Sequence, residues 1–322
     1  MDTEDLARPA PAAADLLHLR PDNARGWLVV LSAAALTGAG IAMSLSAHWE
    51  LWIAGQLVLA AALVQWFAIL HECGHETLFR TRSWHAPAGR LAGFMAGIPY
   101  HSWIRVHGRH HKWTGWQDLD PTTEALVPRP RTRVELIFLN VCWRLWIPVF
   151  SVIYRVSNYW HLPRLNRLFP GIADRRAMRR DLLLLFILYA VIVAISGPAL
   201  ILRVAGLALV LSLAIQDLLI LSQHTHMPQH VSGGAAVRPY PAPEQEPFTR
   251  SLRLPRWASI GVLHFDAHEL HHMYPFVPGY HLARIPYRPA NEVDWWTWVT
   301  GAKRVPANVL LFENRTQSGL EL

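Results

Sequence analysis

Long apolar runs separated by short polar breaks dominate the first part of this chain. Residues 27–47 contain no charged side chain, and after the polar break at residues 48–50 a second apolar run covers residues 51–70. Each run is close to the roughly 20 residues that a helix needs to cross the hydrocarbon core of a bilayer. Because the break is so short, the two runs predict a helical hairpin whose outer ends lie on the same side of a membrane.

A second pair of apolar runs, residues 182–196 and 199–221, flanks the helix-breaking pair Gly197-Pro198. We therefore predict an all-α polytopic membrane protein with four transmembrane helices in two hairpins. Residues 71–181, between the hairpins, are rich in arginine. Positively charged loops stay on the cytoplasmic side of membranes, so we place this segment there.

One apolar stretch within this segment does not fit a simple span. Residues 134–153 are apolar and rich in tryptophan but are interrupted by Glu135, Arg144 and Pro148. This pattern predicts one or two helices lying in the membrane interface, and a fifth span is the alternative.

The composition agrees with a membrane protein. Of the 322 residues, 52% are hydrophobic and 16% are charged, whereas soluble domains carry roughly 25% charged residues. The formal net charge of +7 is the excess that the positive-inside rule produces, and we predict no nucleic-acid partner. We divide the chain into a flexible N-terminal tail (residues 1–25), a membrane domain (residues 26–290) and a cytoplasmic C-terminal tail (residues 291–322).

Histidine carries the candidate chemistry. The chain has 18 histidines, and nine candidate ligands fall into four short clusters: His71 and His75; His107, His110 and His111; His224, with His226 as its rival; and His268, His271 and His272. Spacings of i, i+4 and of i, i+3, i+4 place imidazoles on one face of a helix. Topology places all four clusters on the cytoplasmic side, so they can form one cytoplasmic, histidine-rich cap.

Nine histidines exceed what one zinc ion can use. Imidazole nitrogen binds iron, zinc and copper well, and a structural or catalytic zinc site has about four ligands. The clusters therefore predict two metal ions, with iron as the leading candidate. The isolated histidines are left out of the site; these are His18, His48, His85, His101 and His161.

The first cluster also permits a different class of enzyme. His71-Glu72-Cys73-Gly74-His75 matches H-E-x-x-H, in which two histidines bind zinc and the glutamate acts as general base. A membrane zinc metalloprotease is therefore the distant alternative. Such a site needs only three protein ligands and would leave the other three clusters unexplained.

Acidic residues near the clusters are candidate partners for the second N–H of each ligand. They are Glu72, Asp118, Asp120, Asp217, Asp266 and Glu269. We prefer Asp217 and Asp266, and the segment Asp118–Pro121 could instead form a cap or turn.

Together the clusters resemble the three histidine boxes of the integral-membrane fatty acid desaturase family, part of a wider desaturase and hydroxylase superfamily. The family pattern of H-x-x-x-H, H-x-x-H-H and a second H-x-x-H-H is present at His71, His107 and His268. The first box, the run Gln223–His226 and the run ending in Gly279-Tyr280-His281 are similar to those of plant-type oleate (omega-6) desaturases.

This resemblance implies a di-iron site in the cytoplasmic cap whose ligands are the nine histidines given above. It implies O2 as co-substrate, two external electrons, and formation of a C=C double bond in a fatty acyl chain linked to a lipid, coenzyme A or a carrier. A related hydroxylase, ketolase or acetylenase on a lipid-like substrate is the alternative.

The resemblance also concerns partners. We expect no electron-transfer domain within this chain, so the donor would be a separate ferredoxin, rubredoxin or cytochrome b5 type protein with its reductase. We expect a multi-pass protein of a bacterial inner membrane, with its termini and active site on the cytoplasmic side.

Overall fold

The computed structural model describes residues 9–322 of the chain. The described part is mainly helical, and its one sheet is a two-stranded parallel pair. The described residues form two compact units: unit 1 comprises residues 9–21, 109–147 and 218–322, and unit 2 comprises residues 22–108 and 148–217. Helices α4 (Tyr100–Trp113) and α10 (Leu207–His224) run from one unit into the other.

Unit 2 holds most of the long apolar helices. Besides parts of α4 and α10, its elements are α1 (Asn23–Ser44), α2 (Trp49–Gly74), η3 (Arg82–Trp84), α3 (His85–Ala96), α6 (Val149–Arg155), the π-helical turn η5 (Val156–Trp160), α7 (Leu162–Leu168), α8 (Ile172–Ser196), α9 (Pro198–Ile201) and the π-helical turn η6 (Leu202–Gly206).

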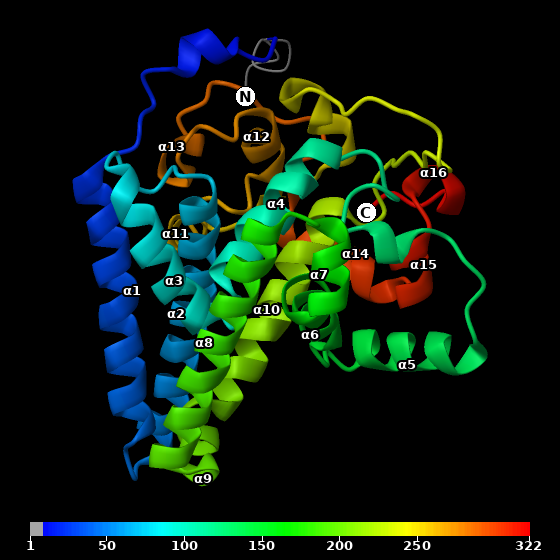
Figure 1. Cartoon of the computed structure of the whole chain (residues 1–322). Helices are drawn as coiled ribbons and strands as arrows, with labels where there is room; N and C mark the ends of the chain where they lie inside the picture. The colour runs from blue at the N-terminus through cyan, green and yellow to red at the C-terminus, as the bar shows by residue number, and fades with distance from the viewer. Residues whose placement is uncertain (1–8) are drawn as a thin grey trace. The chain divides into compact units, whose positions relative to one another are not determined.

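Helices α1 and α2 lie side by side as the predicted hairpin (Figure 1). Glycines allow their backbones to come close together, as small residues do between membrane helices. A Cβ atom on Gly55 would lie 2.6 Å from the backbone nitrogen of Ser44, and one on Gly40 would lie 2.9 Å from the Cβ of Leu59. The hairpin is thus packed too tightly at these positions for any larger residue.

Gln56 of α2 is buried and supplies partners for the irregular backbone of η6. A π-helical turn interrupts the regular hydrogen-bond ladder, and freed backbone groups in an apolar setting need other partners. The Gln56 Nε2 donates to the carbonyl oxygen of Val204 (2.7 Å) and to Ser44 Oγ (2.8 Å), with the Arg203 carbonyl at 3.3 Å. Its Oε1 accepts from the Ala208 N–H at 2.9 Å. One side chain therefore ties α2 to the start of α10.

Three helices of the described chain are long and apolar enough to cross a membrane: α1, α2 and the segment Pro198–His224, which joins α9, η6 and α10. The fourth predicted run lies in α8. This helix is 25 residues long, but it begins ten residues before the apolar run, in a segment dense in arginine and aspartate. Its apolar part of residues 182–196 is about 22 Å long, less than the roughly 30 Å of a bilayer core.

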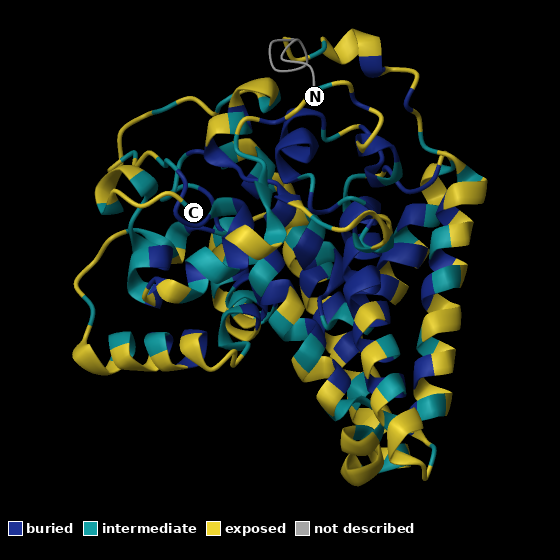
Figure 2. Cartoon of the chain, turned by 180° about the vertical axis from the view of Figure 1, so that it is seen from behind, coloured by how far each residue is buried: buried dark blue, intermediate teal, exposed yellow. Residues whose placement is uncertain are grey.

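The predicted interface segment forms two separate helices. Helix α5 (Arg133–Arg144) ends before α6 begins at Val149, and neither is long enough by itself to span a bilayer. The exposed face of α5 is apolar and includes Val134, Ile137, Phe138 and Val141. In Figure 2 exposed stretches alternate with less exposed ones along this helix.

Unit 1 is made of short elements. These are η2 (Ala13–Leu16), η4 (Glu124–Leu126), α5, η7 (Ala242–Phe248), β1 (Leu252–Arg253), α11 (Arg256–Gly261), α12 (His268–Met273), α13 (Gly279–Leu282), β2 (Val293–Asp294), α14 (Trp295–Arg304), α15 (Ala307–Phe312) and α16 (Arg315–Ser318). In the sheet, Leu252 pairs with Val293 and Arg253 with Asp294.

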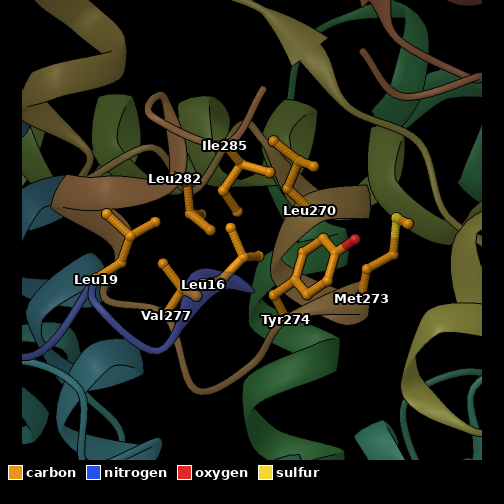
Figure 3. Close-up of a cluster of buried hydrophobic side chains, with 8 residues drawn as sticks. All are labelled: Leu16, Leu19, Leu270, Met273, Tyr274, Val277, Leu282 and Ile285. Carbon is orange, nitrogen blue, oxygen red and sulfur yellow. The ribbon is translucent and has the colours of Figure 1, made fainter. Parts of the chain in front are cut away.

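A hydrophobic cluster in unit 1 supports the helix of the last histidine box. Leu16 and Leu19, which precede α1, pack against residues of and around α12 and α13 (Figure 3). Tyr274, in the same cluster, donates from its hydroxyl to the Pro11 carbonyl at 2.8 Å. These residues belong to the predicted tail 1–25, of which residues 1–8 lie outside the described part; the predicted division of the chain into tail, domain and tail stays a prediction.

Candidate metal centre

Helix α4 presents the second histidine cluster on one face. His107, His110 and His111 follow one another at i, i+3 and i+4, and the helix is continuous through all three. The ring of Trp103 stacks on that of His107, with centroids 4.7 Å apart. The sequence expectation of a helical box is therefore confirmed at this position.

In unit 2, three imidazoles meet where α2 ends. His71 lies in the last turn of α2 and His75 is the residue that caps it. Their ring centroids are 4.9 Å apart, and each lies within 4.8 Å of the His107 ring centroid. The Nε2 atoms of His75 and His107 are 2.7 Å apart. Residues 32 positions apart in the chain thus turn nitrogen atoms toward one point.

In unit 1, four imidazoles form a second group. His110 comes from α4, His224 from the last residue of α10, and His268 and His272 from α12; their nitrogen atoms all lie within 4.8 Å of one another. The Nε2 atoms of His224 and His268 are 2.8 Å apart. Four converging nitrogen atoms from three helices are a donor set for a metal ion. We call this group the histidine quartet.

Two further histidines of unit 1 face each other beside the quartet. His111 follows His110 on α4, and His271 precedes His272 on α12. Their Nε2 atoms are 3.0 Å apart, and the rings of His111 and His272 stack with centroids 4.2 Å apart. Each of the nine predicted ligands therefore belongs to one of three groups of imidazoles: the trio of unit 2, the quartet, or this pair.

Glu269 fixes α12 to the rest of unit 1. Its carboxylate accepts hydrogen bonds from the backbone N–H of Ser251 (3.0 Å) and of Asn291 (2.7 Å), next to the two strands. Burial raises the pKa of Glu269 to about 7, although these hydrogen bonds lower it. Glu269 points to the backbone, so its contacts position the helix that carries His268, His271 and His272.

A carboxylate orients His110. The Asp120 Oδ2 lies 2.7 Å from the His110 Nδ1, and the Asp120 Oδ1 accepts from the N–H and the hydroxyl of Thr122 at 2.8 and 2.9 Å. Burial alone would raise the pKa of Asp120, but the charge and hydrogen bond of His110 outweigh it and hold the pKa below its usual value. The carboxylate accepts a hydrogen bond from the Nδ1–H of His110, which leaves the lone pair on the His110 Nε2 for a metal ion.

The two acidic residues that the sequence preferred as partners of the ligands, Asp217 and Asp266, accept hydrogen bonds from serine residues. Asp217 accepts a hydrogen bond from the Ser151 backbone N–H, and Asp266 accepts from the Ser259 hydroxyl at 2.8 Å. Glu72 does contact a ligand, with 3.3 Å between its Oε1 and the His71 Nδ1. The carboxylate that orients a ligand of the quartet is thus Asp120, which the sequence placed among the candidate partners without preferring it.

A neutral side chain orients His272. The Oε1 of Gln245, in η7, lies 2.9 Å from the His272 Nδ1. Sequence reasoning missed Gln245, because it stands 27 positions before His272 in a segment without helical periodicity. No spacing rule connects a loop glutamine to a distant helix.

The donor set fits iron. The His272 Nε2 is buried and has no hydrogen-bond partner among the described residues, so a metal ion would satisfy it. Burial, together with the neighbouring imidazoles, holds the pKa of His272 well below its ordinary value, and neutral imidazole is the form that binds metals. The clusters contain nitrogen donors and no cysteine thiolate, which agrees with a nitrogen-rich iron site.

Of the two alternative ligands His224 and His226, only His224 belongs to a candidate metal group in the described chain. His224 joins the quartet, whereas His226 turns away, adopts a left-handed backbone with φ of 59°, and places its Nε2 2.6 Å from the Ser318 hydroxyl. Of the histidines that the sequence set aside, His85 contacts the Phe79 carbonyl and His101 contacts Asp174. None of the isolated histidines belongs to a candidate metal group in the described chain.

Glu72 does not have the position that a zinc protease needs. Its carboxylate is buried and accepts from the Thr77 hydroxyl at 2.7 Å, on the side of the His71 Nδ1. A general base of that class instead faces the water on the metal. The H-E-x-x-H match is therefore accounted for by an orienting glutamate.

Comparison with known proteins points to one family. A family model described as "Fatty acid desaturase" matches residues 47–294. A probable fatty acid desaturase of Sorghum bicolor is 26% identical over 270 residues, which is 80% of this chain and 68% of the relative. An omega-6 fatty acid desaturase, chloroplastic, of Brassica napus is 26% identical over 298 residues, covering 86% of this chain and 64% of the relative.

A third relative is bacterial. An sn-1 oleoyl-lipid 12-desaturase of Picosynechococcus is 28% identical over 137 residues, which is 41% of this chain and 39% of the relative. With this protein and that of Brassica napus, the match covers less than two thirds of the relative's own length. The family match includes every predicted metal ligand, from His71 to His272. The expected oxidoreductase class is thereby confirmed, and the chain belongs to the fatty acid desaturase family.

Proposed function

We propose that this protein is an O2-dependent desaturase that introduces a C=C double bond into a fatty acyl chain, with two iron ions held by nine histidines. The proposed ligands are His71, His75, His107, His110, His111, His224, His268, His271 and His272. The histidine quartet is the observation that supports the proposal best, because four imidazoles from three helices, three of them buried and His224 half-buried, turn nitrogen atoms toward one another.

Helix α4 relates the two sets of ligands. His107 belongs to the unit 2 trio and His111 to the unit 1 pair, and they stand one turn apart on the same face of one continuous helix. Helix α4 therefore carries proposed ligands of both sets. Two irons supplied with two external electrons provide the chemistry to activate O2 for removal of hydrogen from an unactivated CH2 group.

The residues of the chain prepare the site for such ions. Asp120 keeps the Nε2 of His110 available, Glu72 lies beside the Nδ1 of His71, and Glu269 anchors the helix of the third box. Burial of these groups excludes water, which protects a reactive centre from side reactions.

For the topology we propose four crossings, by α1, α2, α8 and the α9–α10 segment. The arginines at residues 175–180 then mark the cytoplasmic end of α8. His71 and His224, at the ends of α2 and α10, fall on that same side. We also propose a separate electron donor of the ferredoxin, rubredoxin or cytochrome b5 type.

The names of two relatives suggest the first substrate to test. The Brassica napus protein is named an omega-6 desaturase and the Picosynechococcus protein an oleoyl-lipid 12-desaturase. We propose an oleoyl chain of a membrane lipid as substrate, with oxidation at the 12 position.

The test is expression, together with ferredoxin and its reductase, in a host that makes oleoyl lipids but no diunsaturated ones. Mass spectrometry of the host lipids should show a product lighter by two hydrogen atoms, and the His110→Ala variant should give none. A product heavier by one oxygen atom would instead identify a hydroxylase. Unchanged lipids with an iron-loaded, electron-supplied enzyme would refute the proposed substrate.

A further inference from the structure

Gln245 makes three hydrogen-bond contacts within unit 1. Its Nε2 lies 2.7 Å from the carbonyl oxygen of His111 and 3.0 Å from that of Tyr240, and its Oε1 lies 2.9 Å from the His272 Nδ1. The residue is 2% exposed. This one amide thus touches α4 through the His111 backbone and α12 through the His272 ring.

The contacts fix which way the amide faces. Carbonyl oxygens only accept hydrogen bonds, so the two carbonyls require the NH2 side of Gln245. The amide oxygen must then face His272. Because that oxygen is also only an acceptor, the proton of His272 must be on Nδ1. The lone pair is consequently on Nε2, the buried atom that lacks a hydrogen-bond partner in the described chain.

Two ligands of the quartet therefore have different partners. His110 donates to the charged carboxylate of Asp120, whereas His272 donates to a neutral amide. An anionic acceptor makes an imidazole a more electron-rich ligand than a neutral acceptor does. In a buried site the charge of such partners adds directly to the charge around the metal.

We infer that Gln245 is a positioning residue of the metal centre: it sets His272 in the tautomer that binds metal, holds the end of α4 next to His111, and does so without adding charge. The inference rests on the proposed function in that the quartet must bind a metal ion. The inference goes beyond the proposed function because it assigns a role to a residue outside the histidine boxes.

The first test is metal affinity in a matched pair of variants. Gln245→Met keeps the length of the side chain but removes all three hydrogen bonds. The control is Gln229→Met, since the Gln229 Nε2 donates to the Phe248 carbonyl at 3.3 Å and hydrogen-bonds no histidine of the described chain. Purified full-length protein is titrated with Co2+ and followed by its visible absorption, a readout independent of turnover. We expect affinity to fall about 10- to 100-fold in Gln245→Met and to stay unchanged in Gln229→Met.

The second test is Gln245→Glu, which keeps an acceptor for His272 but adds a negative charge and loses both donors. We expect it to hold iron better than Gln245→Met and to have a lower reduction potential than wild type, measured by spectroelectrochemistry. If Gln245→Met does not fold, the Gln245→Glu variant alone tests the positioning role of Gln245.

The experiments distinguish a failure of the proposed metal site from a failure of the role assigned to Gln245. Wild-type protein that binds neither iron nor Co2+ would contradict the metal site itself. Wild-type binding together with an unchanged Co2+ affinity and spectrum in Gln245→Met would overturn the role of Gln245 alone. So would an unchanged reduction potential in Gln245→Glu.

Discussion

Replacing Asp120 by asparagine should weaken metal binding, although the two side chains have the same shape. The Asp120 Oδ2 accepts from the His110 Nδ1, and its Oδ1 accepts from two donors of Thr122. All three partners donate. The NH2 group of asparagine must therefore face either His110 or Thr122, and in each orientation a buried donor meets another donor. Asparagine also removes the charge that strengthens the bond to His110.

The magnitude follows from the bond that is lost. A hydrogen bond to a charged group contributes about 1.5–3 kcal/mol, and 1.4 kcal/mol corresponds to a tenfold change in a binding constant at about 25 °C. We therefore expect the iron affinity of Asp120→Asn to fall about 10- to 100-fold, the range found for residues that orient metal-binding histidines.

The assay is competition with a graded series of chelator, followed by iron analysis of the purified protein. Asp118→Asn is the matched control. Asp118, two positions away, accepts from the backbone and hydroxyl of Ser232 and from the Gly233 N–H, so its loss should loosen that loop and leave the iron bound. If Asp120→Asn retains iron as firmly as Asp118→Asn, the orienting role of Asp120 is wrong.

Three further predictions concern stability. Gly55→Leu should destabilise the α1–α2 hairpin, since even its Cβ would lie 2.6 Å from the Ser44 nitrogen, whereas Gly38→Leu has open space around it; equal melting temperatures of the two variants in thermal unfolding would contradict the close packing. Gln56→Met should cost on the order of 2 kcal/mol in unfolding free energy, because several buried hydrogen bonds are lost at about 0.6 kcal/mol each; a loss below measurement error would count against its role at η6. Removing the metal by chelation should lower thermal stability, by about 2.7 kcal/mol if the free metal had been at a hundredfold excess over its Kd, and a melting temperature indifferent to metal would argue against binding to the folded state.

Those parts of the fold that depend on local periodicity could be predicted from the sequence. The histidine spacing of α4 follows from 3.6 residues per turn, and the structure has a helix there. The break at Gly197 also appears, with φ of 73° where the chain passes from α8 to α9. The start of α8 is harder to predict, because the mainly charged segment 174–181 precedes the apolar run and hydrophobicity alone does not mark that segment as helical.

The sequence could predict the grouping of ligands only within one helix, where the spacing of the histidines places them on the same face. The quartet combines His110, His224 and His268 from three segments that are far apart along the chain. Helical spacing does not tell how far apart these segments lie in space. Hydrogen-bond partners were harder still. Six acidic residues lie near the ligands along the chain, and Asp217 and Asp266 were preferred among them, but proximity in space, through the turn after α4, determines that Asp120 contacts His110. Gln245 contacts His272 through a loop that carries no periodic pattern.

Metal analysis of the purified wild-type protein tests the central claim most directly. Mass spectrometry for metals, after expression in iron-replete medium, should find two iron ions per chain and little zinc. His110→Ala, which removes a ligand of the quartet, should lower the iron content while His85→Ala, at a buried histidine outside the clusters, should not. One zinc ion per chain and no iron would contradict the di-iron account.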